Sequence, residues 1–185
     1  NAVVSPNLPV RDVIVRGRAR AIPFMRTPAA DVTQPPPGVV FYMDFAGPLI
    51  PSIFHRFTCY VCAVDAGSGY GRLYPAHHMT ALVATTALAA FTAEVGYLMG
   101  FHGAFKPHVV RSDQGSAFVS SHFREFLASQ QIHQSLACTY TPQQNAHAER
   151  FFGVVFSTAR VLLAAASLPP SFHPFALQCS TWIHN

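Results

Sequence analysis

The chain has 185 residues, enough to bury one sizeable core and too few for two large domains. Half of the residues are hydrophobic and 11% are charged, against about a quarter in an ordinary soluble domain, which excludes disorder for most of the chain. The formal net charge is +4, and Lys106 is the single lysine among twelve basic residues.

The first 37 residues carry five of the arginines, scattered prolines and the run Pro35-Pro36-Pro37, without a sustained period of 2 or 3.6. This composition predicts an Arg/Pro-rich linker over residues 1–37, with the folded domain at 38–185. The arginines suit contact with phosphate, and they equally suit a linker that they only keep soluble.

Hydrophobic periodicity and turn residues divide the rest of the chain into alternating elements. Strands are expected at 39–45, 56–65, 70–75, 107–112 and 132–137, and helices at 80–98, 120–130, 143–166 and after residue 170. The order predicts an α/β fold in which helices flank a mixed sheet. The apolar segment 81–100 could be mistaken for a membrane span, but its threonines, Glu94 and the flanking histidines favour a buried helix.

The four cysteines are too few and too irregular for a secreted disulfide scaffold, and no signal peptide opens the chain. A reduced, intracellular compartment fits this pattern. Cys59 and Cys62 form a CxxC, which raises zinc or redox chemistry as an alternative. The run around them has strand composition and no second pair nearby, so buried strand thiols are the favoured interpretation.

Three of the eight acidic residues occupy unusual places. Asp44 lies inside the apolar run of the first strand, Asp113 directly follows the fourth strand, and Glu149 lies in the helix after the fifth. A carboxylate in an apolar strand is costly unless it is paired or binds a metal, and few cations are near in sequence. Converging carboxylates would fit Mg²⁺ or Mn²⁺. The alternative is three separate surface acids that cap helices or turns.

These acids belong to motifs that resemble the catalytic core of retroviral and retrotransposon integrases, with the copia-type branch of LTR retrotransposons as the most similar. Between Asp113 and Glu149 lie 35 residues, the spacing of the family's D,D-35-E signature. The matching segments are Asp44-Phe45-Ala46-Gly47-Pro48, Val64-Asp65-Ala66-Gly67-Ser68-Gly69-Tyr70, Arg111-Ser112-Asp113-Gln114-Gly115 with Phe118, and Tyr140-Thr141-Pro142-Gln143-Gln144-Asn145-Ala146-His147-Ala148-Glu149-Arg150.

The resemblance implies an RNase H-like fold with a five-stranded mixed sheet that brings Asp44, Asp113 and Glu149 together as catalytic metal ligands. Two Mg²⁺ or Mn²⁺ ions would be bound when DNA is present, one by Asp44 and Asp113 and one by Asp44 and Glu149. The activity implied is 3′-end processing and strand transfer, which insert element DNA into target DNA. The partners implied are double-stranded DNA and further copies of the chain in a homo-oligomer, with no membrane. The enzyme would act in the nucleus after residence in a cytoplasmic particle.

The loop and first helical turn before Glu149 are where family members approach DNA ends. The resemblance therefore implies DNA contacts there, although simple capping of the long helix is the alternative for the polar residues. The implied DNA-binding residues are Thr141, Gln143, Gln144, Asn145 and Arg150. The family's zinc-binding module is missing before residue 1, and the core is expected to be truncated at its C-terminal end.

Two other functions stay open at this point. The first is a catalytically inactive RNase H-like module, derived from a retroelement, that binds DNA or protein. The second is an RNase H-like nuclease that cuts RNA, which would share the metal site but not the motif from Thr141 to Arg150. Binding to DNA that does not depend on metal would favour the inactive module.

Overall fold

The structure is a computed structural model, and it describes residues 34–101, 103–137 and 146–185. Five strands form one sheet: β1 (Val40–Ala46), β2 (Cys59–Asp65), β3 (Gly71–Ala76), β4 (Val109–Ser112) and β5 (His133–Leu136). The helices are α2 (Ala81–Leu98), α3 (Ser121–Ser129), α4 (Ala146–Ala165), the 3₁₀ turn η2 (Pro170–Phe172) and α5 (His173–His184). Each predicted strand and helix is therefore present.

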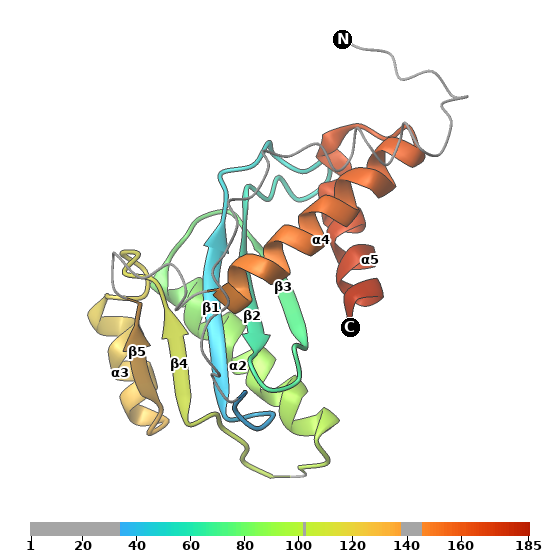
Figure 1. The fold of residues 1–185 in the computed structure, drawn as a ribbon. Helices are drawn as coiled ribbons and strands as arrows, with labels where there is room; N and C mark the ends of the chain where they lie inside the picture. The colour runs from blue at the N-terminus through green and yellow to red at the C-terminus, as the bar shows by residue number, and fades with distance from the viewer. Residues whose placement is uncertain (1–33, 102, 138–145) are drawn as a thin grey trace, which may run out of the picture.

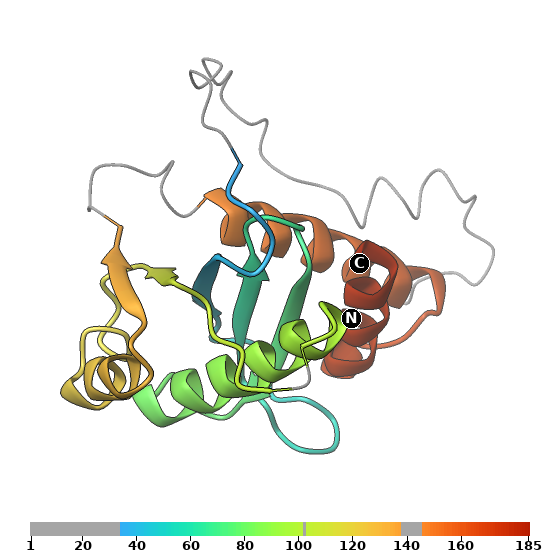
Figure 2. The ribbon, with the colours of Figure 1, turned by 90° about the horizontal axis from the view of Figure 1, so that it is seen from below.

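The strand order is β3-β2-β1-β4-β5, with β1, β2 and β3 antiparallel and with β4 and β5 parallel to β1. This is the mixed sheet that the order of elements predicted. Helix α4 lies in front of the sheet in Figure 1, α5 lies beside α4 next to the β3 edge, and α2 and α3 lie behind the sheet. The view from below shows the same three layers, with the sheet between the two helical layers (Figure 2).

Side chains on β1 alternate between the two faces, as the period of a strand requires. Phe41 and Met43 are fully buried in the core on the α2 side, whereas Val40 and Tyr42 belong to the core under α4 and α5. The same alternation puts Asp44 on the α4 side. Both faces of the sheet are thus covered, which explains why β1 and β2 are apolar along most of their length.

Side-chain caps mark the starts of two helices. The hydroxyl of Thr80 accepts a hydrogen bond from the Val83 N–H at the start of α2, and the hydroxyl of Ser120 accepts one from the Phe123 N–H at the start of α3. One strand boundary was wrong: β2 begins at Cys59 rather than at residue 56. Arg56 has a φ of 56°, a left-handed conformation that an extended strand cannot contain.

Helix α2 is, by length and composition alone, apolar enough to cross a membrane, and 39% of it is buried in this fold. Its Leu88 and Phe91 are almost fully enclosed and pack in the core on the α2 side of the sheet. The prediction of a buried core helix is consistent with this packing.

The last residues of the predicted linker that the structure describes are tied to the β2–β3 turn. The Gln34 side-chain amide donates to the carbonyls of Ala66 and Gly67, and the Gly38 N–H donates to the buried carboxylate of Asp65. Asp65 also accepts from the Ser68 N–H and hydroxyl at 3.1 and 2.6 Å. Asp65 therefore organises the hairpin turn, as predicted, and the domain boundary near residue 38 stays a prediction.

Candidate active site

Strands β1 and β4 bring two of the predicted carboxylates to the same edge of the sheet. The two strands are parallel neighbours, and Tyr42 on β1 pairs with Arg111 on β4. Asp44 lies two residues after Tyr42, and Asp113 lies two residues after Arg111, so both acids are near the carboxyl ends of these strands. A two-residue step returns a side chain to the same face, so Asp44 lies on the side of the sheet that α4 covers.

Helix α4 contributes the third carboxylate from its first turn, where Glu149 is exposed. The helix is held on the sheet by Ala148 and Phe151, which are 0% and 2% exposed in the core under α4. Residues on either side of Glu149 in the helix thus fix its position. The carboxylate itself stays free of the core because it projects from the exposed side of that turn.

The pKa of Asp44 reflects its burial and the charges of the other two carboxylates. Burial raises the pKa of Asp44 from 3.8 to about 6, a hydrogen bond from the Phe45 N–H opposes that rise, and the charges of Asp113 and Glu149 add to it. The Phe45 N–H lies 2.7 Å from Asp44 Oδ1. Asp113 and Glu149 therefore both disfavour the ionised form of Asp44.

The backbone after β4 orients the second carboxylate. The Gly115 N–H donates to Asp113 Oδ1 at 3.0 Å, and a side chain on Gly115 would place its first carbon 3.0 Å from the same oxygen. The glycine therefore lets the chain turn closely around the Asp113 carboxylate. Any larger residue would push that carboxylate away from Asp44.

The donor set fits a divalent cation. Hard carboxylate oxygens are the ligands of Mg²⁺ and Mn²⁺, and two of the described groups that shift the pKa of Asp44 are further carboxylates. Within residues 34–101, 103–137 and 146–185, no three His, Cys, Asp or Glu side chains lie close enough together to share one ion.

The charges of Asp113 and Glu149 both act on Asp44. The role of these three acids as catalytic metal ligands stays a prediction. Arg150 is exposed on α4 beside Glu149. Four predicted DNA contacts, Thr141, Gln143, Gln144 and Asn145, lie outside the described residues. Sequence reasoning missed Tyr42 and Arg111, which lie directly next to the acids. Their spacing of two from Asp44 and Asp113 was the signal, because it puts them on the same face of each strand.

The CxxC has no part in this site. Cys59 and Cys62 are free, buried thiols on β2, and their spacing of three turns them to opposite faces of the strand. Cys62 is fully buried beside Asp44, its partner across β1 and β2. Burial, with the charge of Asp44, raises the pKa of the Cys62 thiol well above its usual range. The two sulfurs cannot bind one zinc ion, so the interpretation as buried strand thiols is confirmed.

Comparison with known proteins gives a consistent result. The integrase core domain family matches residues 34–142. The Pro-Pol polyprotein of feline foamy virus is 33% identical over 124 residues, which are 67% of this chain and 10% of that polyprotein. The Retrovirus-related Pol polyprotein from transposon TNT 1-94 of Nicotiana tabacum is 34% identical over 76 residues, which are 41% of this chain and 6% of that polyprotein. The chain thus spans about a tenth or less of these relatives.

Solved structures share the fold at lower identity. A chain of the simian T-cell lymphotropic virus intasome in complex with PP2A regulatory subunit B56 gamma has a TM-score of 0.66 at 19% identity, over 87% of this chain and 53% of its own. The HTLV-2 integrase catalytic core domain in complex with magnesium, in its dimeric form, has a TM-score of 0.55 at 22% identity, over 80% and 86%. These neighbours confirm the predicted RNase H-like fold.

Proposed function

Because this chain belongs to the integrase core domain family, a family of polynucleotidyl transferases, we propose that it is the catalytic core of a retrotransposon integrase. The proposed activity is divalent-metal-dependent processing of the 3′ ends of element DNA and transfer of those ends into target DNA. A copia-type origin stays a prediction, because the relatives include foamy virus polyproteins as well as a plant transposon polyprotein.

The observation that carries this proposal is that two further carboxylates act electrostatically on the partly buried carboxylate of Asp44. The burial of Asp44 and the charges of Asp113 and Glu149 all disfavour its ionised form. Divalent cations that bind among these acids would offset this effect and stabilise the ionised carboxylates.

In the proposed mechanism, Asp44 and Asp113 would hold one ion, and Asp44 and Glu149 the other. Two bound Mg²⁺ or Mn²⁺ ions would supply activation of the attacking oxygen and stabilisation of the leaving oxygen in phosphoryl transfer. The chain's own contribution is positioning. The Phe45 N–H orients one oxygen of Asp44, the Gly115 N–H orients one oxygen of Asp113, and the packing of Phe151 sets the height of Glu149 above the sheet.

The proposed substrates are double-stranded DNA at the element ends and in the target, and the proposed assembly is a homo-oligomer that acts in the nucleus. Arg150 supports DNA binding because its exposed guanidinium lies next to the carboxylates. Thr141, Gln143, Gln144 and Asn145 are proposed as further DNA contacts because of their place just before α4 in the sequence.

The test is strand cleavage and joining on a branched oligonucleotide that mimics the integration product, with Mg²⁺ or Mn²⁺ present. We expect activity in the natural chain and none in Asp113→Asn, because that variant loses one ligand charge. Glu125→Gln is the matched control, since Glu125 is an exposed acid on α3, on the other face of the sheet. It should keep full activity. A folded chain that neither joins strands nor binds metal in calorimetry would contradict the proposal and leave an inactive binding module.

A further inference from the structure

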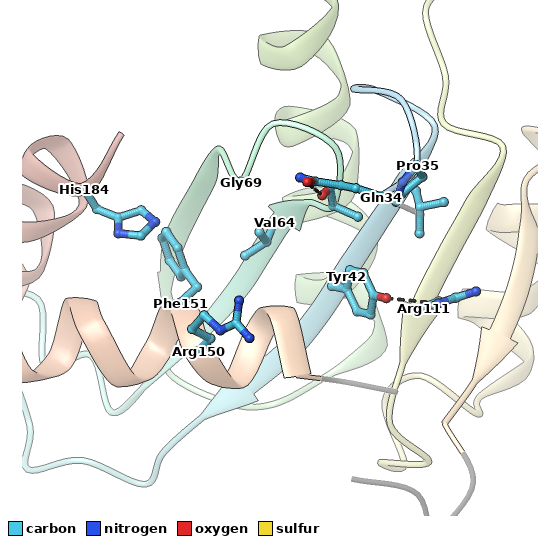
Figure 3. A pocket seen from close by; sticks show the side chains of 11 residues that line it. Gln34, Pro35, Tyr42, Val64, Gly69, Arg111, Arg150, Phe151 and His184 are labelled. Atoms are coloured by element: carbon cyan, nitrogen blue, oxygen red, sulfur yellow. Dashed lines mark hydrogen bonds between the residues drawn. The ribbon is translucent and has the colours of Figure 1, made fainter. Parts of the chain in front are cut away.

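A cavity of about 500 Å³ opens on the α4 face of the sheet. Residues one or two positions along the chain from the three carboxylates line it. Its walls come from β1, β2, β4 and α4, with the chain before β1 along one side (Figure 3). Aromatic and apolar side chains form most of it, and two guanidinium groups supply its charge. The principal lining residues are Val40, Tyr42, Val64, Arg111, Arg150 and Phe151.

Among the residues that the structure describes, no acid pairs with Arg111 in the wall. Its Nη1 donates to the Tyr42 hydroxyl at 3.0 Å, and its guanidinium carbon lies 5.7 Å from the centre of the Tyr42 ring. The Nε of Arg111 is buried and has no hydrogen-bond partner. Arg72, by contrast, is neutralised by an ion pair with Glu94. A guanidinium held by a phenol alone keeps its full charge for a ligand.

Arg150 adds a second positive charge to the same cavity from α4. Figure 3 shows its side chain rising from the helix toward the space beside Tyr42. No ion pair involves Arg150 within the part of the chain that the structure describes. The two guanidinium groups therefore flank one apolar hollow, and the charge of that hollow selects for an anion.

The position of the cavity connects it to the carboxylates. Tyr42 and Arg111 are a registered pair on β1 and β4, and Asp44 and Asp113 come one two-residue step later on the same strands. Such a step covers about 6.6–6.8 Å. One arginine, Arg111, thus comes just before the aspartate that follows β4, and a second, Arg150, directly follows Glu149 on α4. A polyanion bound across the carboxylates would place a neighbouring anionic group near these arginines.

We propose that this cavity binds a phosphate group of the DNA, and that this group neighbours the phosphate held at the carboxylates. Arg111 and Arg150 would be its ligands. The proposal rests on the proposed function, because it takes DNA as the substrate. Tyr42 is a positioning residue, since its hydroxyl fixes the guanidinium of Arg111. Guanidinium forks match the oxygens of a phosphate in geometry as well as in charge, and that geometry favours an oxyanion over a halide ion.

The test measures DNA affinity without metal, so that it does not depend on catalysis. The comparison between variants decides the outcome, because binding in EDTA by itself does not distinguish a catalytic core from an inactive module. Fluorescence anisotropy of a labelled branched duplex in EDTA, between about 50 and 200 mM salt, gives both the affinity and its salt dependence. Arg111→Gln should weaken binding about tenfold, and the slope of log K against log salt should fall by about 1. Arg124→Gln is the matched control, because Arg124 is an exposed arginine on α3 that donates to the Val119 carbonyl.

Two further variants keep the test decisive if Arg111→Gln is poorly folded. Arg150→Gln changes an exposed helix residue and should produce the same loss of slope. Arg111→Lys keeps the charge and should retain the slope while it loses affinity, because a lysine cannot make the guanidinium fork. Equal slopes in Arg111→Gln, Arg150→Gln and Arg124→Gln would overturn the proposal.

Calorimetric titration with inorganic phosphate tests whether the bound phosphate belongs to a DNA strand or to a small phosphate compound. Phosphate that binds the natural chain but not Arg111→Gln, while DNA affinity is equal in both, would overturn the assignment to DNA. Loss of strand joining with intact DNA affinity would count against the proposed function alone. If Arg111→Gln still joins strands and the salt dependence of its DNA affinity is unchanged, the phosphate site in the cavity is contradicted and the proposed function is not.

Discussion

Replacement of Asp44 by Asn should stabilise the folded chain in the absence of metal. The folded pKa of Asp44 is about 6, against an ordinary value of 3.8. At about 1.4 kcal/mol per pK unit, ionised Asp44 costs the folded state about 3 kcal/mol near pH 7.5. Asn has the same shape without the charge, and its side-chain oxygen can still accept from the Phe45 N–H. For a chain of this size the gain corresponds to a rise in Tm of about 6–12 °C.

The sign of the pH dependence follows from the raised pKa. Below about pH 4, Asp44 is protonated in both states and does not lower the free energy of unfolding. As the pH rises through about 6, the carboxyl ionises in the folded state, and the free energy of unfolding falls. The difference between Asp44→Asn and the natural chain should therefore be largest near pH 7.5 and should shrink toward about pH 4.5. The unfolded carboxyl has its ordinary pKa, so the whole effect resides in the folded state.

Urea denaturation in EDTA at the two pH values measures this difference, with Glu125→Gln as the control for loss of an exposed acid. Addition of Mg²⁺ should stabilise the natural chain and not Asp44→Asn, because only the former offers the shared ligand. A variant that is no more stable than the natural chain near pH 7.5, or a gain that is independent of pH, would refute the electrostatic reasoning.

The remaining predictions concern the scaffold. Asp65→Asn should destabilise the fold by about 1–3 kcal/mol in urea denaturation, because its second oxygen accepts from both the N–H and the hydroxyl of Ser68 and an amide NH₂ cannot. Phe91→Ala should cost about 3–5 kcal/mol, since Phe91 is fully buried between α2 and the sheet; a cost near zero would contradict the core described above. Burial lowers the pKa of His173, so acidification below about pH 6.5 should destabilise the natural chain more than His173→Gln, as followed by thermal melts.

Local sequence patterns were sufficient to predict the helices and strands and to identify one acid of the candidate site. Apolar runs of period two, the turn around Gly67 and the capping hydroxyl of Thr80 each depend on neighbours within a few residues, and such short-range chemistry is visible in a sequence. Asp44 could be identified because a charge within an apolar strand is costly wherever that strand lies. The start of β2 was misjudged because the composition near Arg56 does not reveal a left-handed residue.

Asp113 and Glu149 were assigned to the site by resemblance, and their actual meeting depends on pairings between distant segments. Strands β1 and β4 are parallel neighbours although almost 70 residues separate Tyr42 from Arg111. Composition and spacing do not specify which strands become neighbours, because many strand orders bury the same apolar area.

The sequence by itself determined the helices and strands, the mixed character of the sheet, and Asp44 as an acid in an unusual place. Only the tertiary structure decided that Asp44 is the acid whose ionisation is disfavoured, because that depends on burial under α4 and on two charges from other elements. It also decided that Arg111 and Arg150 face one cavity beside those acids. Periodicity is a property of neighbours along the chain, whereas an electric field is the sum over groups that only folding brings near one another.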